Sequence, residues 1–216
     1  MLEARSLACV RGSRRLFEGI DLSVTPGQLL RITGENGSGK TSLLRILCGL
    51  LTPAAGEITW NGIPVHRERE EFHRTLAYIG HSAGLKDELT PVENLAFAGS
   101  LAGQPVDHAA IRRALQAFGV LHCAALPVRN LSQGQRRRVA LARLLLASQA
   151  SLWILDEPFT ALDAAAVAHL EWLIAGHVAA GGMVVLTTHL EVAFNAQVIV
   201  VEHRSEEHTS ELQSRG

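Results

Sequence analysis

The chain has 216 residues, which is enough for one to one and a half ordinary domains and for a hydrophobic core of its own. Hydrophobic residues make up 47% of it and charged residues 19%, and this composition excludes a disordered chain. The net charge of −1 argues against a general nucleic-acid binder, and the three scattered cysteines favour a reducing compartment over a disulfide framework.

No segment has the pattern of a membrane span or of a secretion signal. Residues 164–190 come closest to a span, but Glu171 interrupts them. Glu3 and Arg5 stand where a signal peptide would have its apolar core. We therefore expect the chain to stay in the cytoplasm.

Strand and helix patterns alternate along the chain. The first half is expected to hold a strand at 29–33, a helix at 41–51, a strand at 57–60 before a tight Asn61-Gly62 turn, a solvated charged segment at 66–74, and a helix opened by a capping box at Thr90. The second half is expected to hold a helix at 107–118, a helix from the capping box at Ser132 to about 147, a strand at 152–156, one further helix, and strands at 183–187 and 198–201. Strands that alternate with helices predict a mainly parallel sheet.

One domain is expected over residues 1–203, with a core formed by about 1–80 and 150–203 and a helical lobe inserted at about 90–148. Residues 204–216 contain one large apolar residue, and residues 204–214 resemble one reading frame of a widely used sequencing adapter. We interpret 204–216 as a disordered, non-native-looking tail, and an ordinary polar terminus is the alternative.

A phosphate loop is predicted between the first buried strand and the helix after it. Its residues fit GxxxxGK[ST], and they are Gly34, Glu35, Asn36, Gly37, Ser38, Gly39, Lys40 and Thr41. The glycines let backbone N–H groups surround phosphate oxygens, and the helix N-terminus favours the negative charge. Lys40 supplies a positive charge for the β- and γ-phosphates, and the Thr41 hydroxyl is a ligand for Mg²⁺. The cofactors expected are therefore ATP and Mg²⁺.

Two carboxylates follow the apolar strand 152–156, at the end where open α/β sheets bind ligands. Asp156 is placed to hold Mg²⁺, usually through water. Glu157 is then the expected general base for the water that attacks the γ-phosphate.

With these motifs, the pentapeptide at 131–135 makes the chain resemble the nucleotide-binding subunits of ABC ATPases over nearly everything up to residue 203. The resemblance implies a P-loop NTPase (RecA-like) core with a mainly parallel sheet, an N-terminal antiparallel β portion and an inserted helical subdomain. It also implies that a signature, formed by Leu131, Ser132, Gln133, Gly134 and Gln135, contacts the γ-phosphate of ATP held by a second copy of the chain, in an ATP-sandwich dimer.

Two further segments resemble the motifs of this family. Residues 161–163 resemble the D-loop, which implies that Asp163 lies where two subunits meet. His189 follows a strand and resembles the switch histidine that senses the γ-phosphate. The arginine run 136–138 after the signature is expected to serve the face of its helix.

The chain departs from the family pattern at two positions. Where relatives often stack an aromatic ring on adenine, this chain has Arg11, which either stacks its guanidinium on the base or leaves the base contact weak. Where the family has the glutamine of its Q-loop, this chain has His81, which is either a polar group near Mg²⁺ and water or a plain loop residue.

Five segments look like the ATP-binding subunits of the bacterial cytochrome c maturation (haem exporter) complexes, namely residues 78–81, 84–86, 89–95, 137–143 and 152–163. This resemblance implies an ABC-type translocase ATPase, peripheral on the cytoplasmic face of the bacterial inner membrane. Its implied partners are a separate membrane permease and other cytochrome c maturation membrane proteins, with no nucleic acid. The alternatives are an ATPase subunit of another ABC exporter or importer, or a soluble non-transport ABC ATPase that acts on nucleic acid or ribosomes.

Overall fold

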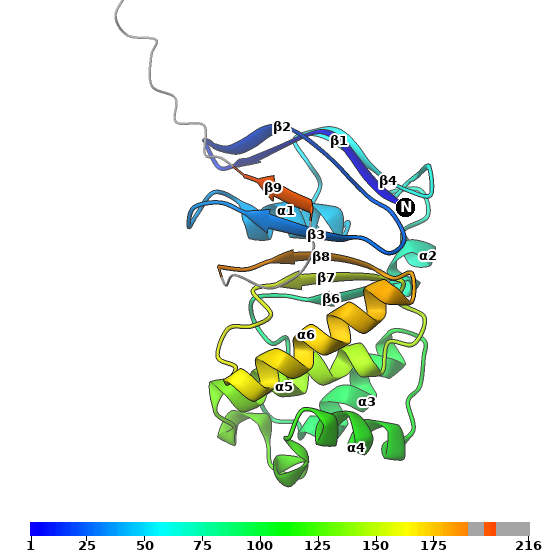
Figure 1. The fold of residues 1–216 in the computed structure, drawn as a ribbon, viewed down its shortest axis with the longest axis vertical. Helices are drawn as coiled ribbons and strands as arrows, with labels where there is room; N and C mark the ends of the chain where they lie inside the picture. The colour runs from blue at the N-terminus through cyan, green and yellow to red at the C-terminus, as the bar shows by residue number, and fades with distance from the viewer. Residues whose placement is uncertain (190–196, 202–216) are drawn as a thin grey trace, which may run out of the picture.

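The computed structural model describes residues 1–189 and 197–201. Its elements form layers: an antiparallel sheet, one helix, a parallel sheet, and then the remaining large helices (Figure 1). Among the described residues, no helix combines the length and the apolar character that a membrane crossing requires.

The antiparallel sheet has the strand order β2-β1-β4-β5. Its strands are β1 (Leu2–Arg11), β2 (Arg14–Val24), β4 (Ala55–Trp60) and β5 (Ile63–Pro64). Asn61 and Gly62 join the last two strands with positive φ angles of 51° and 82°, which are the signs that a tight hairpin turn of two residues needs. The turn predicted from these two residues is therefore confirmed.

The parallel sheet has the order β6-β7-β8-β3-β9, and every neighbouring pair in it runs parallel. Its strands are β3 (Leu29–Thr33), β6 (Leu76–Ile79), β7 (Leu152–Asp156), β8 (Met183–Thr187) and β9 (Gln197–Val200). Strands β7, β8 and β3 are adjacent, so their carboxyl ends lie together at one edge, although β3 is far from the other two in sequence.

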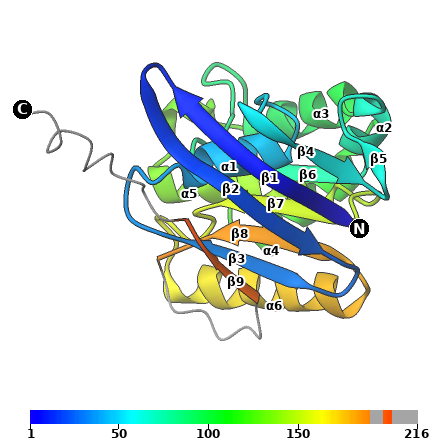
Figure 2. The same ribbon diagram turned by 90° about the horizontal axis from the view of Figure 1, so that it is seen from above.

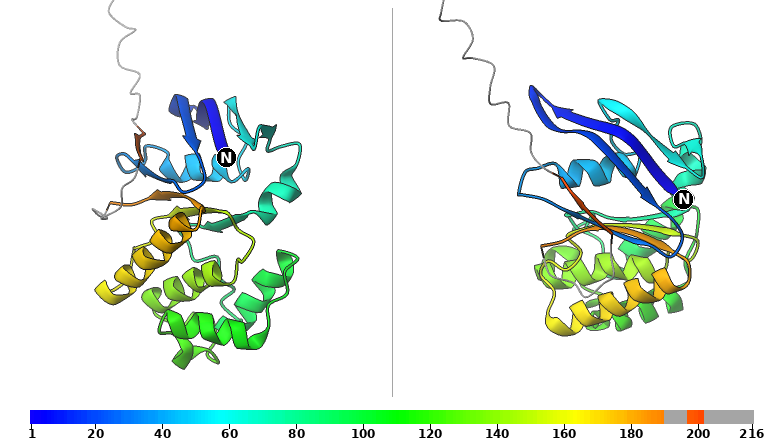
Figure 3. Two further views of the ribbon diagram at one scale, coloured as in Figure 1. Left: turned by 45° about the vertical axis from the view of Figure 1, so that its right-hand side comes forward. Right: turned by 45° about the horizontal axis from the view of Figure 1, so that its top comes forward.

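Helices cover both faces of the parallel sheet. They are α1 (Lys40–Leu47), α2 (Arg69–Arg74), α3 (Pro91–Leu101), α4 (His108–Ala117), α5 (Gln133–Ala142) and α6 (Ala164–Ala179), with 3₁₀ turns at Leu121–Cys123, Val128–Asn130 and Arg143–Leu145. Figures 1 and 2 show α1 between the two sheets and α6 against the opposite face of the parallel sheet. In Figure 3, α3, α4 and α5 gather on the side away from the antiparallel sheet.

Strand β7 is apolar from Leu152 to Leu155 because both of its faces are covered. Leu152 and Ile154 pack into the cluster that contains α1, whereas Trp153 and Leu155 pack into the cluster that contains α6. Successive side chains of a strand point to opposite faces, and both faces are covered, so an unbroken apolar run is the expected sequence for this position.

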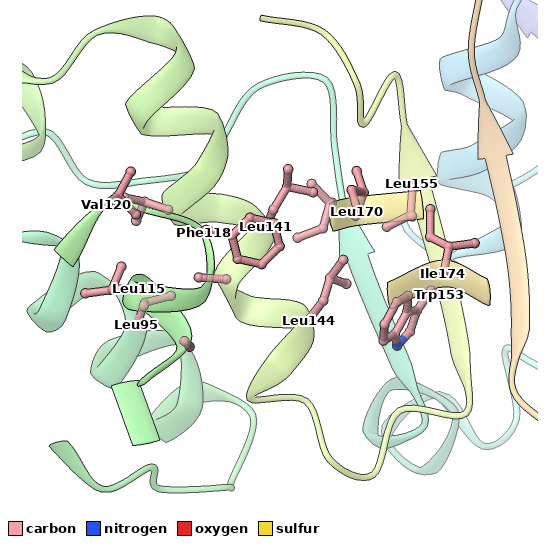
Figure 4. Packing of buried hydrophobic residues seen from close by; sticks show 14 of the residues in the cluster. Leu95, Leu115, Phe118, Val120, Leu141, Leu144, Trp153, Leu155, Leu170 and Ile174 are labelled. Carbon is pink, nitrogen blue, oxygen red and sulfur yellow. The ribbon is translucent and has the colours of Figure 1, made fainter. Parts of the chain in front are cut away.

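The second of these clusters extends without a break into the inserted helices. Figure 4 shows Leu115 and Phe118 of the α4 segment in the same packed group as Leu170 of α6 and Leu155 of β7. The helices of the insertion are therefore packed onto the sheet through shared core residues. The division into a core and a lobe stays a prediction.

Three expected elements differ from the structure. The helix predicted to reach residue 51 ends at Leu47, because Gly49 turns the chain with φ 67° and Leu50 is 54% exposed. The helix predicted to reach about 147 is α-helical only to Ala142 and continues as a 3₁₀ turn. The segment predicted to be solvated surface contains the short helix α2, whose Phe72 is buried.

The buried side of α6 gives a test of this packing. Leu170 is fully buried on α6 and Trp172, on the same helix, is 70% exposed. Leu170→Ala should destabilise the fold by about 2–5 kcal/mol, because it leaves a cavity in the core, and should lower Tm by on the order of 10 °C. Trp172→Ala removes a larger side chain and should change stability by less than about 0.5 kcal/mol. Similar losses in thermal denaturation for both variants would contradict the packing.

Candidate nucleotide-binding site

A cavity of about 700 Å³ opens at the carboxyl edge of β3, β7 and β8. It brings together ten residues that the sequence singles out: Arg11, Asn36, Gly37, Gly39, Lys40, Thr41, His81, Asp156, Glu157 and His189. Four more lining residues were not foreseen: Arg14, Leu16, Ser42 and Thr160. The cavity therefore collects five phosphate-loop residues, both carboxylates and the histidine after β8 in one place, whereas Gly34, Glu35 and Ser38 of the predicted loop do not line it.

The phosphate loop reaches α1 through a left-handed residue. Gly39 precedes the helix with φ 102°, and a Cβ atom there would lie 3.0 Å from the ring of Phe17. Only glycine meets both demands without strain. The Lys40 ammonium donates hydrogen bonds to the carbonyl oxygens of Gly34 and Glu35, both at 2.8 Å, so its charge is held inside the loop. The loop thus combines a cation with a helix N-terminus, which is an anion-binding arrangement.

The Asp156 carboxylate connects this loop to β8. It is 1% exposed, and each of its oxygens accepts one hydrogen bond at 2.8 Å, Oδ2 from the Thr41 hydroxyl and Oδ1 from the Thr187 hydroxyl. Thr187 in turn accepts a hydrogen bond from the backbone N–H of Glu157 at 2.9 Å. Thr41, Asp156 and Thr187 are therefore joined by a chain of hydrogen bonds that ends at the backbone N–H of Glu157.

The same residues fit a magnesium ion. The Thr41 hydroxyl and the Asp156 carboxylate offer adjacent oxygen atoms, the ligand type that Mg²⁺ prefers. The described part of the chain contains no group of three or more His, Cys, Asp or Glu side chains that could hold a metal ion alone. Mg²⁺ keeps several waters and is commonly shared between one or two protein ligands and phosphate oxygens.

Glu157 has an unusual backbone and an unsatisfied carboxylate. Its φ is 49°, in the left-handed region that costs a non-glycine residue about 1–3 kcal/mol unless the surroundings enforce it. Its buried Oε1 makes no hydrogen bond within the described residues, and His189 Nε2 lies 3.4 Å away from it. A buried carboxylate oxygen facing a ligand cavity without a donor is chemically suited to accept a proton from water.

The signature lies at a different surface from the phosphate loop. Ser132 opens α5 with a capping box, in which its hydroxyl accepts from the Gln135 N–H and the Gln135 side chain accepts from the Ser132 N–H. A Cβ atom on Gly134 would come within 2.8 Å of the Ala161 carbonyl oxygen, so the signature packs closely against the D-loop segment. None of the five signature residues, all of which the structure describes, lines the cavity.

Asp163 is tied to the same helix. It caps α6 by accepting a hydrogen bond from the Ala166 N–H at 2.9 Å, and it forms an ion pair with Arg138 of α5. The backbone bond, followed by the bond from Arg138, holds the pKa of the Asp163 carboxyl below its ordinary value. The D-loop segment is thus attached to the signature helix in a single copy of the chain.

Sequence reasoning missed two residues that organise the site. Thr187 was noted only as part of a strand end, yet in the parallel register it lies directly opposite Asp156. Arg137 was expected to serve a helix face and is instead 5% exposed, with its guanidinium against the backbone after β7. The pairing of β7 with β8 could have indicated Thr187, whereas nothing in the run of three arginines distinguishes Arg137.

The mainly parallel sheet and the phosphate-loop cavity define a P-loop nucleotide-binding protein. Residues 17–160 match the family model described as ABC transporter. The chain is 58% identical over 202 residues to the cytochrome c biogenesis ATP-binding export protein of Aromatoleum aromaticum, with 94% of each chain covered. It is 51% identical over 189 residues to the protein of that name from Salmonella typhi, covering 88% of this chain and 89% of that one.

Solved structures show the same fold. The structure of an ATP-binding subunit of an ABC transporter superposes with a TM-score of 0.81 at 26% identity, covering 95% of this chain and 88% of that one. A dimeric post-hydrolysis ATP-binding cassette bound to ADP and Pi superposes with a TM-score of 0.83 at 23% identity, covering 96% and 98%. The chain belongs to the ABC transporter family, and it is an ATP-binding subunit of that family.

The two lysines of the chain allow a matched test of the phosphate loop. Lys40 lies in the cavity, whereas Lys86 lies over the ring of Phe97, with its Nζ 4.4 Å from the ring centre. Lys40→Ala should weaken ATP binding roughly 10- to 100-fold, because charged hydrogen bonds to phosphate are lost. Lys86→Ala should leave the dissociation constant measured by calorimetric titration unchanged. Equal affinity in the two variants would show that nucleotide binds elsewhere.

Proposed function

We propose that this subunit hydrolyses Mg²⁺-ATP in the cavity at the phosphate loop and drives a separate membrane permease in haem export for c-type cytochrome biogenesis. The observation that carries the cellular role is the 58% identity, over 94% of both chains, to a relative named a cytochrome c biogenesis ATP-binding export protein. The observation that supports the chemistry is the pair of carboxylates at the end of β7: each oxygen of Asp156 accepts a hydrogen bond, whereas Oε1 of Glu157 has no hydrogen-bond partner among the described residues.

In the proposed mechanism, ATP places its phosphates against the loop 34–41, where the Lys40 ammonium exchanges its bonds to backbone carbonyls for bonds to phosphate oxygens. Thr41 and Asp156 would hold Mg²⁺, which when bound neutralises negative charge on the phosphates. Arg11, which lines the same cavity, would stack its guanidinium on the base. These residues bind and orient the substrate, and none of them has to move a proton.

Glu157 is the proposed general base. Its free Oε1 faces the cavity and is placed to accept the proton of the attacking water. His189, 3.4 Å from that oxygen, and His81 at the cavity lining are the groups proposed to sense the γ-phosphate and to orient water. The left-handed backbone of Glu157 directs its side chain to the side where Asp156 already points.

A second copy of the chain is proposed to complete the site. The signature is capped, rigid and outside its own cavity, so it is free to meet the phosphates bound by another subunit. A solved cassette of this fold is described as dimeric. The D-loop, attached to α5 through Arg138, would lie where the two copies meet.

The permease is proposed to dock on α3 and on the segment 80–89 beside it, which places the subunit peripherally on the cytoplasmic face of the inner membrane. Phe97 and Leu101 of α3 leave apolar side chains 40% and 73% exposed there. Partly exposed apolar side chains on a surface helix suit a helical partner. Other membrane proteins of cytochrome c maturation are further proposed partners.

Glu157→Gln tests the chemistry. The amide keeps the shape of the side chain but cannot accept the proton, so kcat should fall roughly 100- to 10,000-fold. ATP affinity should stay at the wild-type value, and the unhydrolysed nucleotide should hold two copies together, which size-exclusion chromatography with light scattering in ATP would show as a dimer. Glu171→Gln, at a half-buried position of α6 that does not line the cavity, is the matched control and should behave like the wild type. Normal turnover in Glu157→Gln would remove the base assignment.

Complementation tests the cellular role. A bacterium lacking its own cytochrome c maturation ATPase should recover holo-cytochrome c, measured by haem staining, when this chain is expressed with its cognate permease. Glu157→Gln should not support recovery. If the wild-type chain binds the membrane and hydrolyses ATP but restores no holo-cytochrome c, another exporter or importer is the better account. If it is instead stimulated by ribosomes or DNA, the non-transport alternative is favoured.

A further inference from the structure

Three consecutive arginines on α5 have three different environments. Arg136 forms an exposed ion pair with Asp87 at 2.9 Å, and Arg138 forms one with Asp163 at 2.5 Å. Arg137, between them, is 5% exposed and forms no ion pair within the described residues. Its position on the helix therefore turns it inward, toward the sheet.

The Arg137 guanidinium donates hydrogen bonds to four backbone carbonyl oxygens. Three of them are consecutive and begin at the last residue of β7: Asp156 at 2.8 Å, Glu157 at 2.7 Å and Pro158 at 3.3 Å. The fourth belongs to Gly80, at 2.8 Å, directly after β6 and before His81. One side chain of the signature helix thus holds the turn with both carboxylates and the segment with the cavity histidine.

The hydrogen bonds from Arg137 are made to a backbone segment with a strained conformation. Glu157 has φ 49°, and its N–H is already bonded to Thr187. Arg137 bonds the carbonyl of the same residue, so both backbone polar groups of the strained residue are held. A planar guanidinium presents its donors in a fixed fork, which defines the positions of several acceptors at once in a way that an ammonium does not.

Burying the positive charge of Arg137 beneath α5 is opposed by its desolvation. Burial lowers the pKa of the Arg137 guanidinium, while the nearby Asp156 and Glu157 carboxylates act in the opposite direction. A buried charged side chain is weak evidence for stability, because its desolvation opposes the hydrogen bonds it forms. The four hydrogen bonds from Arg137 to carbonyl oxygens are therefore better explained by the backbone geometry that they fix than by a gain in folding stability.

We infer that Arg137 is a positioning residue for ATP hydrolysis: through the main chain it holds Glu157 in the left-handed conformation that points its carboxylate into the cavity, and it fixes His81 beside it. The inference rests on the proposed function, since it takes Glu157 as the base. Arg137 does not line the cavity, so it acts on the reaction without touching ATP. Removing it should affect turnover and leave binding of the nucleotide intact.

The test uses the full-length subunit and three variants. Arg137→Met keeps the length of the side chain without its donors, and Arg137→Lys keeps the charge without the fork. Arg113→Met removes an exposed guanidinium from α4 and is the matched control. For each variant, kcat, the dissociation constant for Mg²⁺-ATP and Tm are measured beside the wild type and Glu157→Gln.

Arg137→Met should lower kcat about 10- to 100-fold, because an error of about 1 Å in the position of a catalytic group has an effect of that size. Its ATP dissociation constant should stay within about twofold of the wild type, as for loss of an interaction that serves only the transition state. Arg137→Lys should recover Tm more fully than kcat, and Arg113→Met should match the wild type in all three quantities.

Two outcomes would overturn the inference. One is an Arg137→Met kcat close to that of the wild type. The other is full turnover in Arg137→Lys, which would show that the buried charge is sufficient; this second comparison also decides the question if Arg137→Met fails to fold. A wild-type chain that does not hydrolyse ATP, or Glu157→Gln with normal turnover, would instead remove the proposed function itself.

Discussion

The two hydrogen bonds on the Asp156 carboxylate are the interaction on which the rest of the site depends. A carboxylate that is 1% exposed must be compensated, and the two donors come from different elements: Thr41 from the start of α1 after the phosphate loop, and Thr187 from the end of β8. Both donors are within reach only because β7, β8 and β3 run parallel, with Asp156 directly opposite Thr187. Strand order, register and the position of the phosphate loop are thus coupled through one buried charge.

The helices that pack on the parallel sheet hold its strands, and the loops that follow them, in place. Strand β7 is apolar on both faces because α1 covers one and α6 the other, so the turn after it cannot shift without opening the core. Helix α5 then connects two loops: it packs on the D-loop through Gly134 and binds Asp163 of that loop through Arg138, while Arg137 binds the turn after β7. A displacement of the signature residues would therefore move both neighbouring loops, because they are in direct contact.

Features with a local cause could be predicted from the sequence, and features with a distant cause could not. The strands 29–33, 152–156 and 183–187, the two capping boxes and the Asn61-Gly62 turn follow from patterns within a few residues. The burial of Phe72 depends on a distant element that packs there, since its ring centre lies 5.6 Å from that of Trp60 of β4. At the site, glycine and acidic motifs predicted the lining residues, whereas the role of Arg137 is visible only when α5 lies on the sheet.

The two adjacent carboxylates show why a motif alone underdetermines chemistry. In a regular strand, consecutive side chains point to opposite faces, so Asp156 and Glu157 should not share a cavity. They do share it, because β7 ends at Asp156 and Glu157 leaves the strand with φ 49°. Their environments then differ: Asp156 accepts a hydrogen bond at each oxygen, whereas the buried Oε1 of Glu157 has none within the described residues. A carboxylate whose two oxygens are oriented by hydrogen bonds and keep further lone pairs is suited to hold a cation, and an oxygen without a donor is suited to accept a proton. The different environments of these two neighbouring residues follow from one left-handed backbone angle and from the groups that hold it.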